Sequence, residues 1–222
     1  MTRACDIVLS VCPPHAAAAV AREARGFAGI YVEANAVSPA TARAIGEIAT
    51  SGTAAFVDGG IIGAPPKPGA KGPTLYLSGE DAAQVEATLG RLGIQARAIE
   101  GGVGAASALK MSYAGITKGI TAIATIMVLG AARAGAGEAL LAELRESQPL
   151  LLARFAKGLP DMAPKAYRWV AEMQEIAAFL EGDPAGVSMF QAAAELYDRI
   201  ARDAAAERQE VGELEAFAKR AG

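Results

Sequence analysis

The chain has 222 residues, enough for one large domain or two small ones. Hydrophobic residues make up 52% of it, which excludes an intrinsically disordered chain. A net charge of −3 and only 5% aromatic residues argue against a basic, base-stacking surface, so we expect no nucleic-acid partner. The beginning of the sequence lacks a signal-peptide pattern, and its most apolar stretch, 119–132, is shorter than the about 20 residues of a membrane span. We therefore expect a cytoplasmic protein without a membrane partner, in which this stretch is a buried core helix.

The first hundred residues alternate between short apolar runs and helical segments, as in an α/β protein. The run 6–11 is apolar along most of its length, which is typical of a strand that is buried on both faces. Ser38 and Pro39 predict a helix start, with serine as the N-cap and proline in the first turn. The predicted strands are 6–11, 30–34, 54–58, 74–78 and 95–99, and the predicted helices between them are 15–25, 39–50 and 79–93.

From Gly104 onward the pattern is helical. One long helix is predicted over 105–134, where Gly135 and Gly137 end it. Further helices are predicted over 138–157, 164–181 and 187–218, separated by Pro160, Pro164 and the turn 182–184. The fold class is therefore α/β followed by all-α, with a long helix joining the two parts.

The segment Gly102–Ser107 comes close to the glycine-rich fingerprint of dinucleotide-binding folds. That fingerprint requires a second strand after the helix, with an acidic residue about 20 positions further on. Here one unbroken helix follows, and the next acidic residue is Glu138. We interpret these glycines as a tight strand-to-helix corner.

Lys110 lies near the start of the long helix, on a stripe that also contains Tyr113, Ala114, Thr117 and Thr121. A lysine in so apolar a helix either lines a site or extends its ammonium group to solvent. Periodicity alone leaves both interpretations open.

The segment from Gly104 through Lys110 to Ile116 resembles the G-x-x-x-x-x-K-x-x-x-N-G segment of 6-phosphogluconate and 3-hydroxyisobutyrate dehydrogenases. The segments 8–14, 33–39 and 58–63 are similar to the strand ends that line the cofactor and substrate in this superfamily. The segment 168–177 resembles a branch described as NAD-binding phosphogluconate dehydrogenases, whose C-terminal domain is a domain of unknown function.

The resemblance implies that 1–103 is the C-terminal part of a Rossmann-like dinucleotide-binding domain and that 104–222 is a helical domain for substrate binding and dimerisation. It implies an oxidoreductase that uses NADP or NAD to transfer a hydride to or from a small hydroxyacid-like substrate, as a homodimer. Lys110 would be the catalytic general acid/base. The implied cofactor-binding residues are Pro13, Pro14 and Asn35, and the implied substrate-binding residues are Asp58, Gly59, Gly60 and Tyr113.

Several of these residues have structural alternatives. Asn35 and Asp58 are also typical of turn caps, Ser107 of a helix cap, and Tyr113 can simply pack. The chain also departs from the superfamily at two positions, with Ala114 where the family has asparagine and Ile62 where it has serine. Both changes make the expected pocket more apolar, which suits an imine or ketone reductase on the same scaffold as a second candidate.

The phosphate-binding first half of a dinucleotide domain is not found in this sequence. We therefore expect a fragment, with a trimmed chain and a natural truncation as alternatives, and an apolar strand edge left unpaired near Ile7–Val11. A non-catalytic dimeric protein that no longer binds cofactor is the third functional candidate.

Overall fold

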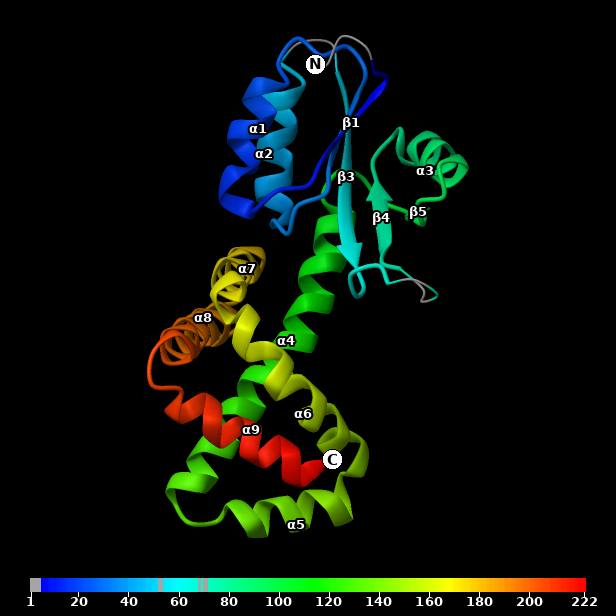
Figure 1. The fold of residues 1–222 in the computed structure, drawn as a ribbon. Coiled ribbons are helices and arrows are strands. Elements are labelled where there is room, and N and C mark those ends of the chain that lie inside the picture. Colours follow the sequence, from blue (N-terminus) through cyan, green and yellow to red (C-terminus); the bar gives the residue numbers. More distant parts are fainter. Residues whose placement is uncertain (1–4, 52–53, 68, 70–71) are drawn as a thin grey trace. The chain divides into compact units, whose positions relative to one another are not determined.

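The computed structural model describes residues 5–51, 54–67, 69 and 72–222. The chain forms two compact units, coloured along the chain in Figure 1. The first, which we call the sheet unit, extends to Tyr113 and includes 178–182. The second, the helical unit, comprises 114–177 and 183–222. The division falls inside the long helix rather than at the strand-to-helix corner before it.

The sheet unit contains a five-stranded sheet in the order β1-β2-β3-β4-β5. Strand β3 is parallel to β2 and antiparallel to β4, while β1–β2 and β4–β5 are parallel pairs. The predicted α/β class is confirmed, and the strands are β1 (Ile7–Ser10), β2 (Ile30–Glu33), β3 (Ala55–Ile62), β4 (Thr74–Ser78) and β5 (Ala96–Ala98).

Strand β3 is longer than predicted. The predicted strand ended at Asp58, yet Gly59 and Gly60 continue it and lie opposite Leu77 and Tyr76 of β4. The antiparallel partner supplies the backbone hydrogen bonds that make the extended conformation favourable for these glycines.

Helices cover both faces of the sheet. After a 3₁₀ turn, Pro14–Ala16, helices α1 (Ala17–Glu23) and α2 (Pro39–Ala49) pack on one face, and α3 (Ala82–Arg91) packs on the other (Figure 1). The Ser38 hydroxyl accepts a hydrogen bond from the Thr41 backbone N–H at 3.2 Å, which confirms the predicted N-cap of α2.

Strand β1 is the edge of the described sheet, where its only partner is β2. Its residue Leu9 is 38% exposed, and Val11 just beyond it is 61% exposed. A cavity of about 950 Å³ lies between α3 and the amino ends of β1, β2 and β3. The expected apolar edge near Ile7–Val11 is therefore present in the described part of the sheet.

The long helix α4 (Ala105–Arg133) starts in the sheet unit and continues through the helical unit. The helical unit also contains α5 (Gly137–Ser147), α6 (Pro149–Met162), the 3₁₀ turn Ala163–Lys165, most of α7 (Ala166–Phe179), α8 (Pro184–Ala205) and α9 (Gln209–Ala221).

Two predicted helices are in fact four. The predicted helix 138–157 breaks before Pro149, which begins α6, because the fixed φ of proline suits the first helical position and proline lacks the N–H that would continue α5. The predicted helix 187–218 breaks at Arg208, whose φ is +56°. Pro160 was expected to separate helices and instead lies inside α6.

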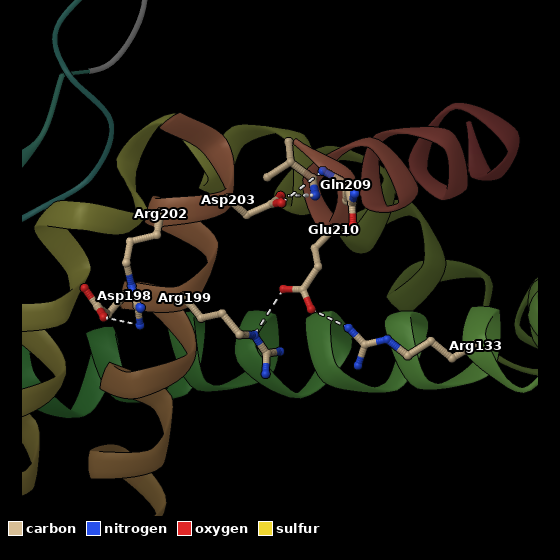
Figure 2. A network of polar contacts seen from close by, with 8 residues as sticks. Arg133, Asp198, Arg199, Arg202, Asp203, Gln209 and Glu210 are labelled. Atoms are coloured by element: carbon tan, nitrogen blue, oxygen red, sulfur yellow. Dashed lines mark hydrogen bonds and ion pairs between the residues drawn. The ribbon is translucent and has the colours of Figure 1, made fainter. Parts of the chain in front are cut away.

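Hydrogen bonds and ion pairs connect α4, α8 and α9 (Figure 2). The Asp203 carboxylate accepts hydrogen bonds from the backbone N–H groups of Gln209 and Val211 and so caps α9. Glu210 pairs with Arg133 of α4 and with Arg199 of α8, at 3.1 Å in the second case. Half-exposed pairs of this kind contribute little individually, so the buried apolar faces of these helices supply most of the stability.

By length and composition alone, α4 could cross a membrane, a test that core helices of soluble proteins also pass. Its most apolar window has a mean hydropathy of 1.5, and 44% of that window is buried. The expected buried core helix is therefore only partly buried: Val128 and Leu129 are buried, whereas Ile123 and Met127 are about half exposed.

Candidate functional site

Asp58 of β3 joins the sheet to the start of α4. Its side chain is fully buried, and one carboxylate oxygen, Oδ2, accepts hydrogen bonds from the backbone N–H groups of Gly104 and Ser107 at 3.0 and 2.9 Å. The Ser78 hydroxyl donates to the same oxygen at 3.1 Å, and the Ser107 hydroxyl donates to Oδ1 at 2.5 Å. A carboxylate at a helix N-terminus is stabilised both by the N–H groups that it caps and by the helix dipole.

Glycines let the backbones of β3 and α4 approach closely. A Cβ at Gly60 would lie 2.9 Å from the Ala106 carbonyl oxygen and 2.9 Å from the Cβ of Lys110. Gly104 has a φ of +105°, which only glycine adopts without strain, and this confirms the predicted tight corner before the helix. Lys110 is thereby packed directly against the end of β3.

Lys110 is half-buried, about one turn beyond the residues that Asp58 caps. Of the predicted substrate-binding residues, Gly60 packs against Lys110, while Tyr113 lies one turn further along α4 and is 49% exposed. The buried Asp58 carboxylate is occupied by hydrogen bonds to α4, which favours the capping alternative for this residue over substrate contact. Ser107 is occupied in the same network, which favours its own capping alternative.

Asn35 is buried at the carboxyl end of β2, where it ties the ends of two strands together. Its side-chain amide donates to the Ser10 hydroxyl at 3.1 Å, and its side-chain oxygen accepts a hydrogen bond from the backbone N–H of Cys12. These contacts favour the turn-capping alternative for Asn35. The turn that it holds leads into Pro13, which is exposed, and Pro14, which is half-buried.

Glu33 is a residue of this edge that the sequence interpretation overlooked. Its side chain is fully buried; one carboxylate oxygen accepts a hydrogen bond from the backbone N–H of Asn35 at 3.1 Å, and the other has no hydrogen-bond partner among the described residues. Burial raises the pKa of Glu33 to about 7, although hydrogen bonds from Asn35 and Ser10 oppose that rise. The sequence signal that could have revealed Glu33 is an acidic residue at the end of an otherwise apolar strand.

A second overlooked cluster lies in the helical unit. Glu172 of α7 is buried and forms an ion pair with Lys118 of α4. The Lys118 ammonium also lies 5.1 Å from the centre of the Trp169 ring, within cation–π range. The sequence did not indicate this ion pair, because helical spacing shows which side chains share a face and not which face another helix covers.

Comparisons with known proteins give a family for part of the helical region and a fold for most of the chain. Residues 131–200 match the family model described as a domain of unknown function, DUF1932. No curated protein matches the chain significantly.

Three solved structures are similar over most of the chain. A conserved hypothetical protein from Sinorhizobium meliloti 1021 is 25% identical, with a TM-score of 0.69 over 96% of this chain and 76% of that one. A conserved protein of unknown function, described as structurally similar to 3-hydroxyacid dehydrogenases, is 29% identical, with a TM-score of 0.68 over 90% and 76%. The Mycobacterium tuberculosis 3-hydroxyisobutyrate dehydrogenase, solved with L-serine, is 14% identical, with a TM-score of 0.66 over 97% and 80%.

These similarities confirm the expected fold, a partial Rossmann-like sheet followed by a helical region. The DUF1932 match likewise confirms the resemblance that was noted for the segment 168–177.

We predict that Asp58→Asn lowers the free energy of unfolding by about 2–4 kcal/mol, because the asparagine side chain replaces an acceptor oxygen with a donor group facing the N–H groups of α4. Urea denaturation measures this loss. Asp81→Asn is the matched control, since Asp81 sits at the start of α3 without a side-chain cap bond. Equal losses in the two variants would contradict the capping role.

We predict that Glu33 makes stability depend on pH. The pKa of Glu33 in the folded protein, about 7, lies above the reference value of 4.5, so the folded state binds the proton more tightly and stability falls as pH rises from about 4.5 to 7. As the pH rises from 4.5 to 8, the free energy of unfolding of Glu33→Gln should therefore increase by roughly 2–3 kcal/mol relative to that of the unaltered protein. Denaturation curves across this range, with the exposed Glu47→Gln as control, should show the gain only for Glu33→Gln.

Proposed function

We propose that this chain carries the proton-transfer site of an NAD(P)-dependent oxidoreductase that acts on a small hydroxyacid-like substrate, with Lys110 as the general acid/base. The observation that carries the proposal is the position of Lys110, packed on Gly60 beside the carboxyl end of β3. Ligands of open α/β sheets bind outside the carboxyl ends of the strands. The structural similarity to 3-hydroxyacid dehydrogenases supports the same class of reaction.

The residues present fit the nicotinamide end of a dinucleotide. The turn after β1 exposes apolar Val11 and Pro13 at the carboxyl edge of the sheet, and the buried Asn35 side chain holds the backbone of that turn. Pro13 and Pro14 would contact the nicotinamide ribose, and Asn35 would position them. The described residues do not include a glycine-rich turn that could hold the pyrophosphate. The cofactor supplies hydride transfer to or from the carbon that bears the hydroxyl group.

Lys110 would move the accompanying proton. During oxidation its neutral amine takes the proton of the substrate hydroxyl, and during reduction its ammonium returns a proton to the carbonyl oxygen. Its Cβ is packed against Gly60, which fixes the base of the side chain from which the amine would extend to the substrate. Tyr113, one turn along the helix and about half exposed, would offer a hydroxyl to the same substrate.

The substrate we propose is smaller and more apolar than 6-phosphogluconate. Ala114 is buried, so it offers no polar group where the superfamily has asparagine, and Ile62 ends β3 where the superfamily has serine. The same two residues favour the second candidate, an imine or ketone reductase, which needs fewer polar contacts to its substrate.

We predict that Lys110→Met lowers kcat by about 10²–10⁴-fold on a 3-hydroxyacid, with little change in the stabilisation that NAD(P) gives to the folded protein. A spectrophotometric assay of nicotinamide reduction, together with unfolding temperatures at several cofactor concentrations, measures both effects. Lys219→Met, an exposed lysine on α9, is the control for loss of a charge. An unchanged kcat in Lys110→Met would contradict the role of Lys110 as the general acid/base.

A homodimer is part of the same proposal. On the helical-unit part of α4, Ile116, Ile123, Ile126 and Met127 are between 48% and 64% exposed at helical spacing, which leaves an apolar stripe in water. A second copy of the chain would bury that stripe.

We predict that Ile123→Glu shifts the protein from dimer to monomer, because it places a charge in the middle of the apolar stripe that the dimer would bury. Sedimentation velocity at micromolar concentration measures the shift. Ala192→Glu, at an exposed position of α8, should leave the dimer unchanged. A monomeric mass for the unaltered protein would contradict the dimer.

A further inference from the structure

A small pocket of about 320 Å³ lies within the helical unit, between α4, α6 and the start of α7. Its volume is at the lower end of the range for small-molecule sites. Four basic side chains line it, with one acidic side chain and one aromatic ring: Lys118, Arg154, Lys157, Lys165, Asp161 and Trp169.

The pocket is positively charged in a protein whose net charge is −3. Lys118 is neutralised by Glu172, but Arg154, Lys157 and Lys165 form no ion pair with any residue that the structure describes. Asp161 is the one carboxylate of the lining. About two positive charges are therefore left without counter-charges around the pocket, where Arg154 and Lys157 are exposed and accessible to a ligand from solvent.

The walls of the pocket are held in place by contacts behind them. The Trp169 ring is fixed between the Lys118 ammonium, 5.1 Å from its centre, and the edge of Tyr197, whose ring centre is also 5.1 Å away. The Tyr197 hydroxyl donates to the Lys118 carbonyl oxygen at 2.6 Å. Ordered walls of this kind reduce the entropy cost of binding a ligand.

Arg154 is directed toward α4. Its Nη2 donates to the Thr117 carbonyl oxygen at 3.3 Å, which directs the exposed guanidinium group toward the α4 wall of the pocket. A guanidinium group has five N–H donors, so four are left for a ligand. Lys157, one turn of α6 further on, and Lys165 in the following 3₁₀ turn add flexible ammonium groups to the same pocket.

We propose that this pocket binds the phosphate group of a small phosphorylated molecule. A phosphate dianion matches the two excess positive charges, whereas a single carboxylate would neutralise one of them. Arginine forms paired hydrogen bonds with phosphate oxygens, and lysines act as point charges beside them. This site is independent of Lys110 and of the proposed oxidoreductase activity, because it is formed by the helical unit alone.

The test uses inorganic phosphate and the full chain, without nicotinamide cofactor. Unfolding temperatures are measured at pH 7.5 across phosphate concentrations, with sodium chloride holding the ionic strength constant. We expect a saturable rise in the unfolding temperature, as for a ligand that binds only the folded state. Isothermal titration calorimetry gives the affinity directly.

The charge-removing variants are Arg154→Gln and Lys157→Gln, each expected to weaken phosphate binding about tenfold or more. Lys157 forms no hydrogen bond or ion pair with the residues that the structure describes, so Lys157→Gln keeps the test valid even if Arg154→Gln affects folding. Lys219→Gln on α9 removes the same charge away from the pocket and should bind as the unaltered protein does.

Two results would overturn the proposal. One is a rise in the unfolding temperature that does not saturate, or that sodium chloride reproduces, since this would be a general salt effect. The other is equal affinity in Lys157→Gln and Lys219→Gln, since the phosphate would then respond to net charge and not to the pocket. Both are independent of the Lys110→Met assay, so either proposal can fail alone.

Discussion

The buried carboxylate of Asp58 is the constraint on which the sheet unit and its candidate site depend. Removing a charge from water is costly unless it is hydrogen-bonded, and here both oxygens accept bonds from the start of α4, while Oδ2 also accepts one from Ser78. The same bonds satisfy N–H groups that a helix start leaves without partners. Any shift of α4 along its axis would break the hydrogen bonds to Asp58. These bonds therefore fix the position of Lys110, which lies one turn further along the helix.

The carboxyl edge of the sheet is unusual because its polar side chains are mostly turned inward. Ser10, Asn35, Asp58 and Ser78 are all buried and bonded to one another or to backbone groups. They fix the turns from which exposed residues, such as Pro13, reach solvent. Glu33 is the exception, because it is buried with one oxygen that has no partner among the described residues, and burial raises its pKa to about 7. Polar residues here act largely through the backbone that they hold.

Much of the fold could be predicted from local patterns. The strand Thr74–Ser78 and the N-cap at Ser38 follow from alternation and turn chemistry, and both are present. The continuation of β3 through Gly59 and Gly60 could not be predicted, since it depends on pairing with β4. The ion pair between Lys118 and Glu172 was missed for a similar reason: it joins residues 54 positions apart, and helical periodicity carries no information about such a partner.

By itself the sequence determined the order of strands and helices, the glycine corner before α4 and the choice of Lys110 as the residue to test. These properties depend on contacts within a few residues, where steric and hydrogen-bonding rules act locally. Only the tertiary structure decided that Asp58 faces the helix, that Asn35 ties two strands together, and that three basic side chains without an ion pair to the described residues line one pocket. Burial and charge neutralisation depend on neighbours brought from distant parts of the chain.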